Sequence, residues 1–190
     1  MKVGLYFGSF NPIHIGHLII ANHVAEHTDV DQVWLVVSPQ NPLKPAASLL
    51  NEYQRLHLVQ LAIENNPQLK ASDVEFKLPK PSYTIDTLVY LEEKYPNHQF
   101  SIILGGDSLS NIGKWKNADV LLKNYQLIVY QRPEYAVTNS PSNKNMTVLN
   151  APLLDISATT IRQYIKQGKS IQYLVADKVR EEIDKNRYYK

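Results

Sequence analysis

The sequence predicts an α/β fold, a Rossmann-like doubly wound parallel sheet with a helical C-terminal appendage. Short β-rich runs alternate with segments of helical spacing, which is typical of strands joined by crossover helices on both faces of a sheet. Runs such as VWLVV are almost continuously apolar, as strands buried on both faces are. The 190 residues are therefore expected to form one domain over 1–190, with 157–190 as its helical C-terminal portion.

Six strands are predicted from runs rich in β-branched and aromatic residues and bounded by turn signals. They cover residues 3–7, 33–37, 74–78, 100–104, 127–130 and 147–149. In such sheets the connections are right-handed, and ligands bind beyond the carboxyl ends of the strands. Polar clusters follow these runs directly, so we expect one ligand site at that edge of the sheet.

The helices are predicted from apolar residues that recur every three or four positions. They cover residues 18–26, 52–64, 85–95, 118–123 and 158–167, and a last amphipathic helix follows a turn within 170–190. Four residues of good N-cap type stand at the helix starts: Asn51, Thr84, Asn117 and Ser157. Gly168 is well placed to end the helix over 158–167.

Composition and charge exclude several classes of function. The formal net charge of +2 is too small to indicate nucleic-acid binding through bulk electrostatics. Cysteine does not occur, which excludes disulfides, thiolate catalysis and cysteine-ligated zinc. No apolar run approaches the length of a membrane span, and the N-terminus lacks the pattern of a signal peptide. We therefore expect a cytoplasmic protein without a nucleic-acid or membrane partner.

The first seventeen residues, MKVGLYFGSFNPIHIGH, carry the strongest signal. A strand leads through Gly8-Ser9 into a helix, whose N-terminal N–H groups and positive dipole end attract phosphates. His14 and His17 are three positions apart and share one face of that helix. Gly16 removes a side chain where a flat purine can lie against the backbone. Two histidines at this spacing also suit a metal, and a glycine after a strand is often only a turn.

A second polar motif, DISATTIR at 155–162, follows the last predicted strand. Ser157 caps a helix whose first turns hold Thr159, Thr160 and Arg162. Main-chain N–H groups, hydroxyls and a guanidinium together make a phosphate cradle. Taken alone, the segment also fits an ordinary capped helix with an exposed arginine.

These motifs resemble those of a known superfamily. GSFNPIHIGH resembles the G-x-F-x-P-x-H-x-G-H signature of the nucleotidyltransferases, and DISATTIR resembles their I-S-S-T-x-I-R signature, with Ala158 in place of the second serine. PSYTIDTL, followed by LGGDSL and Trp115, is similar to segments of bacterial nicotinate mononucleotide adenylyltransferases, and this resemblance covers nearly the whole chain. The chain departs from the family at Leu78 and Lys80, where the family carries Arg and Gly, and NPLK at 41–44 lacks the family's His.

The resemblance implies transfer of AMP from ATP to nicotinate mononucleotide, giving nicotinate adenine dinucleotide (deamido-NAD) and pyrophosphate in NAD biosynthesis. The residues that it places at ATP are Gly8, Ser9, Phe10, His14, Gly16, His17, Ile156, Ser157, Thr159 and Arg162. The residues to which it gives catalytic roles are His14, His17 and Arg162. The residues that it places at the acceptor mononucleotide are Asn41, Lys44, Thr84, Asp107, Trp115 and Arg132. Mg²⁺ is expected to be held mainly by the ATP phosphates, without a protein ligand set for a metal.

Several other readings fit parts of the pattern. Trp115 also suits a core position, and Asp107 also suits a helix cap. An adenylyltransferase that accepts both pyridine mononucleotides shares all the motifs, whereas a phosphopantetheine adenylyltransferase or a cytidylyltransferase does not predict PSYTIDTL. A non-catalytic nucleotide sensor would release no pyrophosphate, and a metalloprotein would use His14, His17 and His23. The oligomeric state is left open, with a homo-oligomer as one expectation.

Overall fold

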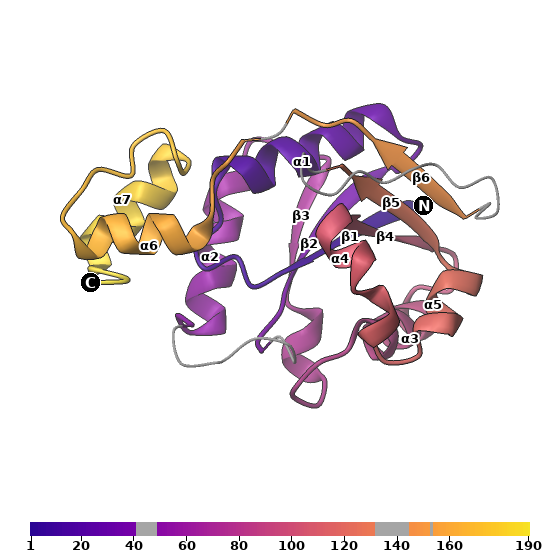
Figure 1. The fold of residues 1–190 in the computed structure, drawn as a ribbon. Coiled ribbons are helices and arrows are strands. Elements are labelled where there is room, and N and C mark those ends of the chain that lie inside the picture. The colour runs from indigo at the N-terminus through magenta and orange to yellow at the C-terminus, as the bar shows by residue number, and fades with distance from the viewer. Residues whose placement is uncertain (41–48, 132–144, 153) are drawn as a thin grey trace.

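The computed structural model describes residues 1–40, 49–131, 145–152 and 154–190. Its centre is a six-stranded sheet in the order β3-β2-β1-β4-β5-β6, in which every neighbouring pair of strands is parallel (Figure 1). The strands are β1 (Lys2–Gly8), β2 (Gln32–Val37), β3 (Leu69–Ser72), β4 (Gln99–Gly105), β5 (Gln126–Tyr130) and β6 (Met146–Leu149). The strand order reverses between β1 and β4, and doubly wound folds bind ligands in the crevice at such a switch point.

Helices cover both faces of the sheet. They are α1 (Ile15–His27), α2 (Glu52–Ile63), α3 (Thr84–Lys94), α4 (Gly106–Ser110), α5 (Ala118–Asn124), α6 (Ala158–Lys166) and α7 (Asp177–Asn186), with the 3₁₀ turns η1 (Val74–Lys77) and η2 (Ile112–Lys114). One core contains apolar side chains from one face of the sheet and from α1, α2, α6 and α7, with α6 and α7 beyond α2 (Figure 1), and the other contains those from the opposite face and from α3 and α5. The fold class predicted from the sequence, including the helical C-terminal appendage, is confirmed.

The central strands are buried on both faces, as their apolar sequence predicts. Along β2, Val33, Leu35 and Val37 join the core with α1 and α2, whereas Trp34 and Val36 join the core with α3. Successive side chains of a strand point to opposite faces, so the run VWLVV fills two cores at once. None of these five side chains is more than 3% exposed.

One predicted strand, at residues 74–78, is wrong. The edge strand is β3, which comes earlier in the chain, and its four residues pair with residues 33–36 of β2. Because β2 ends at Val37, hardly any partner position remains, and the chain forms the turn η1 instead. The apolar Val74 and Phe76 suggest a strand by composition, but in the structure they pack against the two cores from a turn.

The predicted helix ends are partly confirmed. Asn51 accepts a hydrogen bond from the N–H two residues on at 2.9 Å, and Ser157 accepts one from the N–H three residues on at 3.1 Å. Gly168 follows α6 with a φ of +66°, in the left-handed region that glycine adopts readily. Thr84 is wrong as an N-cap, because the extended residue before it takes that position, and Asn117 is the N-cap of α5 without a side-chain cap.

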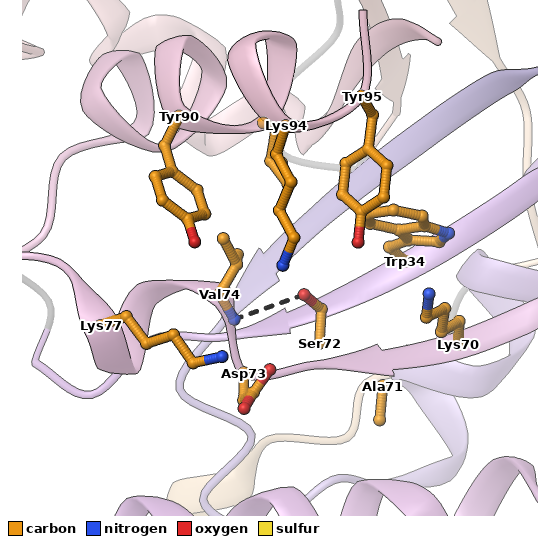
Figure 2. Close-up of a pocket in the computed structure, with 11 residues that line it drawn as sticks. Trp34, Lys70, Ala71, Ser72, Asp73, Val74, Lys77, Tyr90, Lys94 and Tyr95 are labelled. Carbon is orange, nitrogen blue, oxygen red and sulfur yellow. Dashed lines mark hydrogen bonds between the residues drawn. The ribbon is translucent and has the colours of Figure 1, made fainter. Parts of the chain in front are cut away.

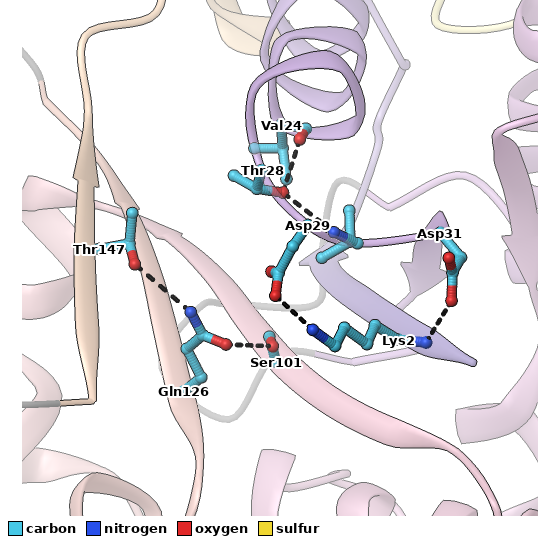
Figure 3. Close-up of polar contacts among 9 residues, drawn as sticks. Lys2, Val24, Thr28, Asp29, Asp31, Ser101, Gln126 and Thr147 are labelled. Atoms are coloured by element: carbon cyan, nitrogen blue, oxygen red, sulfur yellow. Dashed lines mark hydrogen bonds and ion pairs between the residues drawn. The ribbon is translucent and has the colours of Figure 1, made fainter.

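The amino ends of the strands are held together by polar contacts of their own (Figure 3). The Lys2 N–H donates to the Asp31 carboxylate at 2.6 Å, and the Lys2 ammonium donates to Asp29 at 2.5 Å. The Gln126 side chain of β5 contacts a hydroxyl on each neighbouring strand, both at 3.4 Å. These contacts stabilise the end of the sheet that lies opposite to the carboxyl ends of the strands.

The two C-terminal helices join the start of α1 and the outer face of α2. In α7, Lys178 forms an ion pair with Glu64 at the end of α2. The carbonyl of Leu174, between α6 and α7, accepts a hydrogen bond from the Ile15 N–H at 2.9 Å. Because Ile15 is the first residue of α1, this bond fixes the appendage to the first motif. Across the ranges that the structure covers, no helix has the length and apolar character needed to cross a membrane.

Candidate active site

The first motif forms the loop between β1 and α1 at the carboxyl edge of the sheet. His14 occupies the N-cap of α1, and His17 lies in its first turn. Their rings stack with centroids 3.6 Å apart and planes inclined by 27°. The main-chain N–H of His14 donates a hydrogen bond to Nδ1 of His17 at 3.3 Å. The two imidazoles therefore sit together at the positive end of the helix dipole, as their spacing predicts.

Phe10 and two glycines set the position of these histidines. The Phe10 ring is 1% exposed and lies edge-on to His17, with centroids 5.1 Å apart. A Cβ at Gly8 would lie 2.8 Å from the Phe10 ring, and a Cβ at Gly16 would lie 3.1 Å from Nδ1 of His14. Both glycines therefore permit close ring packing, and the space beside Gly16 holds the His14 ring. The Phe10 side chain supports His17 from the core.

The second motif contacts the first directly. Arg162 of α6 donates a hydrogen bond to the Asn11 carbonyl at 2.8 Å and another to the Thr159 hydroxyl at 3.3 Å. Ser157 caps the same helix and lies 2.8 Å, oxygen to oxygen, from the Thr160 hydroxyl. Two segments from opposite ends of the chain thus lie in contact, with a helix N-terminus from each.

Arg55 is a buried residue of the site region that sequence reasoning missed. Its side chain is 0% exposed and donates to four main-chain carbonyls, those of Ser9, Ser38, Pro39 and Leu50. Burial lowers the pKa of its guanidinium. Since Ser9 follows β1 and Ser38 follows β2, Arg55 fixes the two loops that leave neighbouring strands.

Glu75 is a second buried residue that sequence reasoning missed. Its carboxylate is 2% exposed and accepts hydrogen bonds from the Ser82 hydroxyl at 2.7 Å and the Thr87 hydroxyl at 3.0 Å. Burial raises the pKa of Glu75, and hydrogen bonds from Ser82, Ser38 and Thr87 oppose that shift. Glu75 therefore holds the PSYT segment and the first turn of α3 against the end of β2.

The structure brings two predicted acceptor residues to neighbouring segments. Thr84 is the first residue of α3 and is half-buried, and Trp115 follows η2 and packs at the margin of the core under α3. Lys116, next to Trp115, donates to the Asp86 carboxylate at 2.8 Å and lies 4.9 Å from the centroid of the Tyr83 ring. The Trp115 loop is therefore tied to the start of α3. Trp115 is neither fully buried nor fully exposed.

Asp107 lies in the first turn of α4, just beyond the end of β4. A Cβ at Gly105 would lie 2.5 Å from Oδ1 of Asp107 and 3.0 Å from the Tyr130 hydroxyl. A side chain at position 105 would therefore displace this carboxylate. The Tyr130 hydroxyl of β5 in turn lies 3.5 Å from the Tyr6 hydroxyl of β1. Asp107 thus stands beside the switch point between β1 and β4.

Three of the predicted acceptor residues, Asn41, Lys44 and Arg132, lie outside the described residues. Ser9 and Ile156 are half-buried, whereas Ser157 and Thr159 are exposed.

The metalloprotein reading receives no support from the described ranges. His23, its third histidine, stacks on His27 in the last turns of α1 with centroids 3.9 Å apart. Within the part of the chain that the structure covers, no group of three or more His, Cys, Asp or Glu side chains could hold a metal ion.

Comparison with known proteins decides the family. The model of the cytidylyltransferase-like family matches residues 5–164. A relative from Cytophaga hutchinsonii, named probable nicotinate-nucleotide adenylyltransferase, is 55% identical over 189 residues, which cover 100% of this chain and 98% of the relative. A relative of the same name from Flavobacterium psychrophilum is 52% identical over 192 residues, with 100% of both chains covered. The chain belongs to the nicotinate-nucleotide adenylyltransferases of the cytidylyltransferase-like family.

Solved structures agree with this family on the fold. A Plasmodium falciparum nicotinic acid mononucleotide adenylyltransferase, solved as a complex with NaAD, matches with a TM-score of 0.85 and 21% identity, covering 99% of this chain and 97% of that chain. A protein from Vibrio parahaemolyticus described as a nicotinate-nucleotide adenylyltransferase matches with a TM-score of 0.74 and 20% identity, covering 99% of this chain and 94% of that chain. The chain therefore shares the fold of these two solved structures over almost its whole length.

Proposed function

We propose that the chain transfers the AMP moiety of ATP to nicotinate mononucleotide, giving nicotinate adenine dinucleotide and pyrophosphate in NAD biosynthesis. The observation that carries this proposal is the hydrogen bond of 2.8 Å from Arg162 to the Asn11 carbonyl. It joins the two phosphate motifs, so that His14 and His17 at the start of α1 and Ser157 at the start of α6 serve one triphosphate. The 55% identical relative with the corresponding name supports the choice of reaction.

The chemistry needs alignment and charge stabilisation rather than a general base. A phosphate oxygen of the mononucleotide, already anionic at neutral pH, attacks the α-phosphorus of ATP. The bond from that phosphorus to the oxygen bridging to the β-phosphorus breaks, and pyrophosphate leaves with the electron pair. Positioning and preorganised donors dominate catalysis of such transfers. His14 and His17, at the positive end of α1, would stabilise the charge at the α-phosphate.

The start of α6 would hold the β- and γ-phosphates. Ser157 and Thr159 are exposed there, and Arg162 is half-buried. A guanidinium has five N–H donors in a rigid fork, and the contacts with Asn11 and Thr159 use only part of that set. The contact with Asn11 also fixes the direction of the fork, which favours a bidentate grip on phosphate oxygens.

The acceptor would lie between the start of α3 and the Trp115 loop. The Trp115 indole offers a flat apolar surface for the pyridine ring, and Asp107 can accept hydrogen bonds from ribose hydroxyls. The N–H groups at the start of α3, where Thr84 lies, are suited to a carboxylate. Asn41, Lys44 and Arg132 keep their proposed acceptor roles from the family resemblance alone.

Mg²⁺ is part of this proposal as an ion that enters with ATP. When bound, it would neutralise phosphate charge while keeping several of its waters, so few protein ligands are needed. We also propose a cytoplasmic location, which agrees with the absence of cysteine from the full sequence.

The two candidate acceptors differ only in the substituent of the pyridine ring, which is a carboxylate in nicotinate mononucleotide and an amide in the nicotinamide form. We expect nicotinate mononucleotide to be preferred. A carboxylate accepts hydrogen bonds at both oxygens, whereas the amide NH₂ would face the donors near Thr84. An unmatched buried pair of this kind costs roughly 1–3 kcal/mol, or about one to two decades in kcat/KM. Pyrophosphate release measured with each mononucleotide in turn tests this expectation.

The same assay separates the competing functions. A reaction without acceptor measures background hydrolysis of ATP, and a reaction with 4′-phosphopantetheine tests the related adenylyltransferase. Equal kcat/KM with acid and amide would show a dual-specificity enzyme and reject the acid-selective pocket. Release with neither mononucleotide would reject the proposed reaction and favour a nucleotide sensor.

A further inference from the structure

A small cavity lies at the edge of the sheet, away from the residues assigned to the active site. Its walls are β3, the turn η1 and the C-terminal half of α3, and its volume is about 80 Å³ (Figure 2). A buried water needs roughly 10–15 Å³ of such space, so the cavity corresponds to about five to eight water positions. That volume suits a small polar ion.

Three ammonium groups gather around this cavity. The Lys70 ammonium lies 4.3 Å from the centroid of the Trp34 ring, and the Lys94 ammonium lies 5.5 Å from that of Tyr95. Aromatic faces attract cations, so these contacts hold both charges at the wall. Lys77 lines the cavity from η1. No ion pair among the described residues involves any of the three lysines.

Hydroxyl groups and one carboxylate complete the lining. In Figure 2 the hydroxyls of Tyr90 and Tyr95 and the ammonium of Lys94 point from α3 toward β3, where the Ser72 hydroxyl faces them. Asp73, next to Ser72, is the one carboxylate among the lining residues. Three ammonium groups and one carboxylate leave an excess of positive charge, so the cavity favours a small anion.

We propose that this cavity binds inorganic phosphate as the hydrogen phosphate dianion. At neutral pH this ion combines acceptor oxygens, which match the ammonium and hydroxyl donors, with one P–OH that can donate to the Asp73 carboxylate. Sulfate has the same shape and charge but no proton, so Asp73 would repel it. The dianion of a phosphomonoester lacks that proton too. The mixed lining therefore selects hydrogen phosphate from among tetrahedral dianions.

The two tryptophans of the full sequence allow a direct test that separates this cavity from the active site. Trp34 lines the cavity, and its indole N–H is held by Gln32 at 3.0 Å, whereas Trp115 lies in the proposed acceptor region. We would follow both indole N–H resonances of the ¹⁵N-labelled full chain, assigned with Trp115→Phe, while titrating sodium phosphate at constant ionic strength and pH. We expect a saturable shift of the Trp34 resonance. This shift should occur whether or not phosphate also shifts the Trp115 resonance, which follows binding in the acceptor region.

Variants make the assignment specific. Lys77→Gln and Lys94→Gln should each weaken the phosphate affinity reported by Trp34 by about two- to fivefold, as expected for the loss of a charge pair at an exposed lysine. Lys123→Gln, at an exposed position of α5, should leave this phosphate affinity unchanged.

The choice of anion tests the role of Asp73. Sulfate and glycerol 3-phosphate should bind more weakly than phosphate, and Asp73→Asn should reduce the difference in affinity between phosphate and these two anions. The proposal is overturned if Trp34 responds to phosphate no more than to sodium chloride. It is also overturned if the response is unchanged in the Lys77→Gln, Lys94→Gln double variant.

Discussion

The His17 ring is held by its neighbours before any substrate binds. It stacks on His14 at 3.6 Å and lies edge-on to Phe10 at 5.1 Å and to Tyr6 at 6.1 Å, measured between ring centroids. A ring fixed in this way stabilises transition-state charge without first having to be ordered. Its contribution should therefore appear in turnover more than in binding of the acceptor.

We expect His17→Ala to lower kcat by roughly 10²–10³, the usual effect of removing one preorganised transition-state contact. The KM for nicotinate mononucleotide should change much less. Steady-state pyrophosphate release with the purified, folded variant measures both constants. His27→Ala, an exposed position near the end of the same helix, is the matched control and should behave like the wild type. Near-normal turnover in His17→Ala would remove this residue from the mechanism.

Arg162 tests the link between the two motifs. Arg162→Lys keeps the charge but loses the planar fork that contacts Asn11 and Thr159. Since hydrogen bonds to charged groups contribute roughly 1.5–3 kcal/mol, kcat/KM for ATP should fall by about one to two decades. The effect should include a higher KM for ATP, whereas Arg180→Lys on α7 should have none. Unchanged ATP kinetics in Arg162→Lys would favour the ordinary capped helix.

The residues differ in how visible their roles are in the sequence. His14, His17 and Arg162 could be proposed because they lie in two motifs that resemble the signatures of the nucleotidyltransferases. Arg55 donates to main-chain carbonyls, which every residue type carries, so no partner residue marks its role. The one sign of its burial in the sequence is its spacing from Leu58. Leu58 lies three positions later and therefore on the same face of the helix, which is buried.

At the scale of elements, Glu75 connects η1 to α3. Glu75→Gln keeps the size of the side chain, but its amide has one acceptor oxygen for the two hydroxyls of Ser82 and Thr87. A lost hydrogen bond of roughly 0.5–1.5 kcal/mol should loosen the start of α3 and raise the KM for nicotinate mononucleotide by about two- to tenfold. The KM for ATP should change less, because α6 and α1 are separate from this contact.

The comparison of the two KM values distinguishes positioning from general destabilisation. Glu93→Gln, at an exposed position of α3, is the matched control and should leave both constants unchanged. If Glu75→Gln raises both KM values equally, or neither, Glu75 does not position the acceptor segment.

The elements also show where sequence reasoning succeeds and where it stops. The central strands could be placed because burial on both faces requires a continuous apolar run, as in β2. The edge strand β3 could not, since LKAS is half-polar and owes its place to pairing with β2. Nothing in the segment over 74–78 reveals that β2 has no partner positions left for it. Pairing of strands far apart in sequence is decided by the assembled sheet, and a short run does not carry that information.

The whole molecule is tied together by its C-terminal helices. α6 contributes Arg162 to the site, and the chain after it returns to cap α1 through Leu174 and to cover α2 through α7. Ile183 of α7 is 0% exposed in the core that also contains Val24 of α1 and Val59 of α2. If the appendage and the sheet form one cooperative unit, as the single-domain prediction requires, a substitution that removes the packing of Ile183 should destabilise both together.

Ile183→Ala should lower the free energy of unfolding by roughly 2–5 kcal/mol, since it leaves a cavity in a well-packed core. Unfolding by urea, followed separately by far-ultraviolet circular dichroism and by tryptophan fluorescence, should show one transition at a lower midpoint in both signals. Both tryptophans lie outside the appendage, so fluorescence reports the sheet while circular dichroism reports all the helices. Val89→Ala, at a position of α3 that is 47% exposed, should leave the midpoint almost unchanged. An early loss of helix signal while the fluorescence transition stays in place would show instead that α6 and α7 unfold on their own. The prediction of a single cooperative domain over 1–190 would then be wrong, and the proposed phosphate contacts of Arg162 would depend on an appendage with a stability separate from that of the sheet.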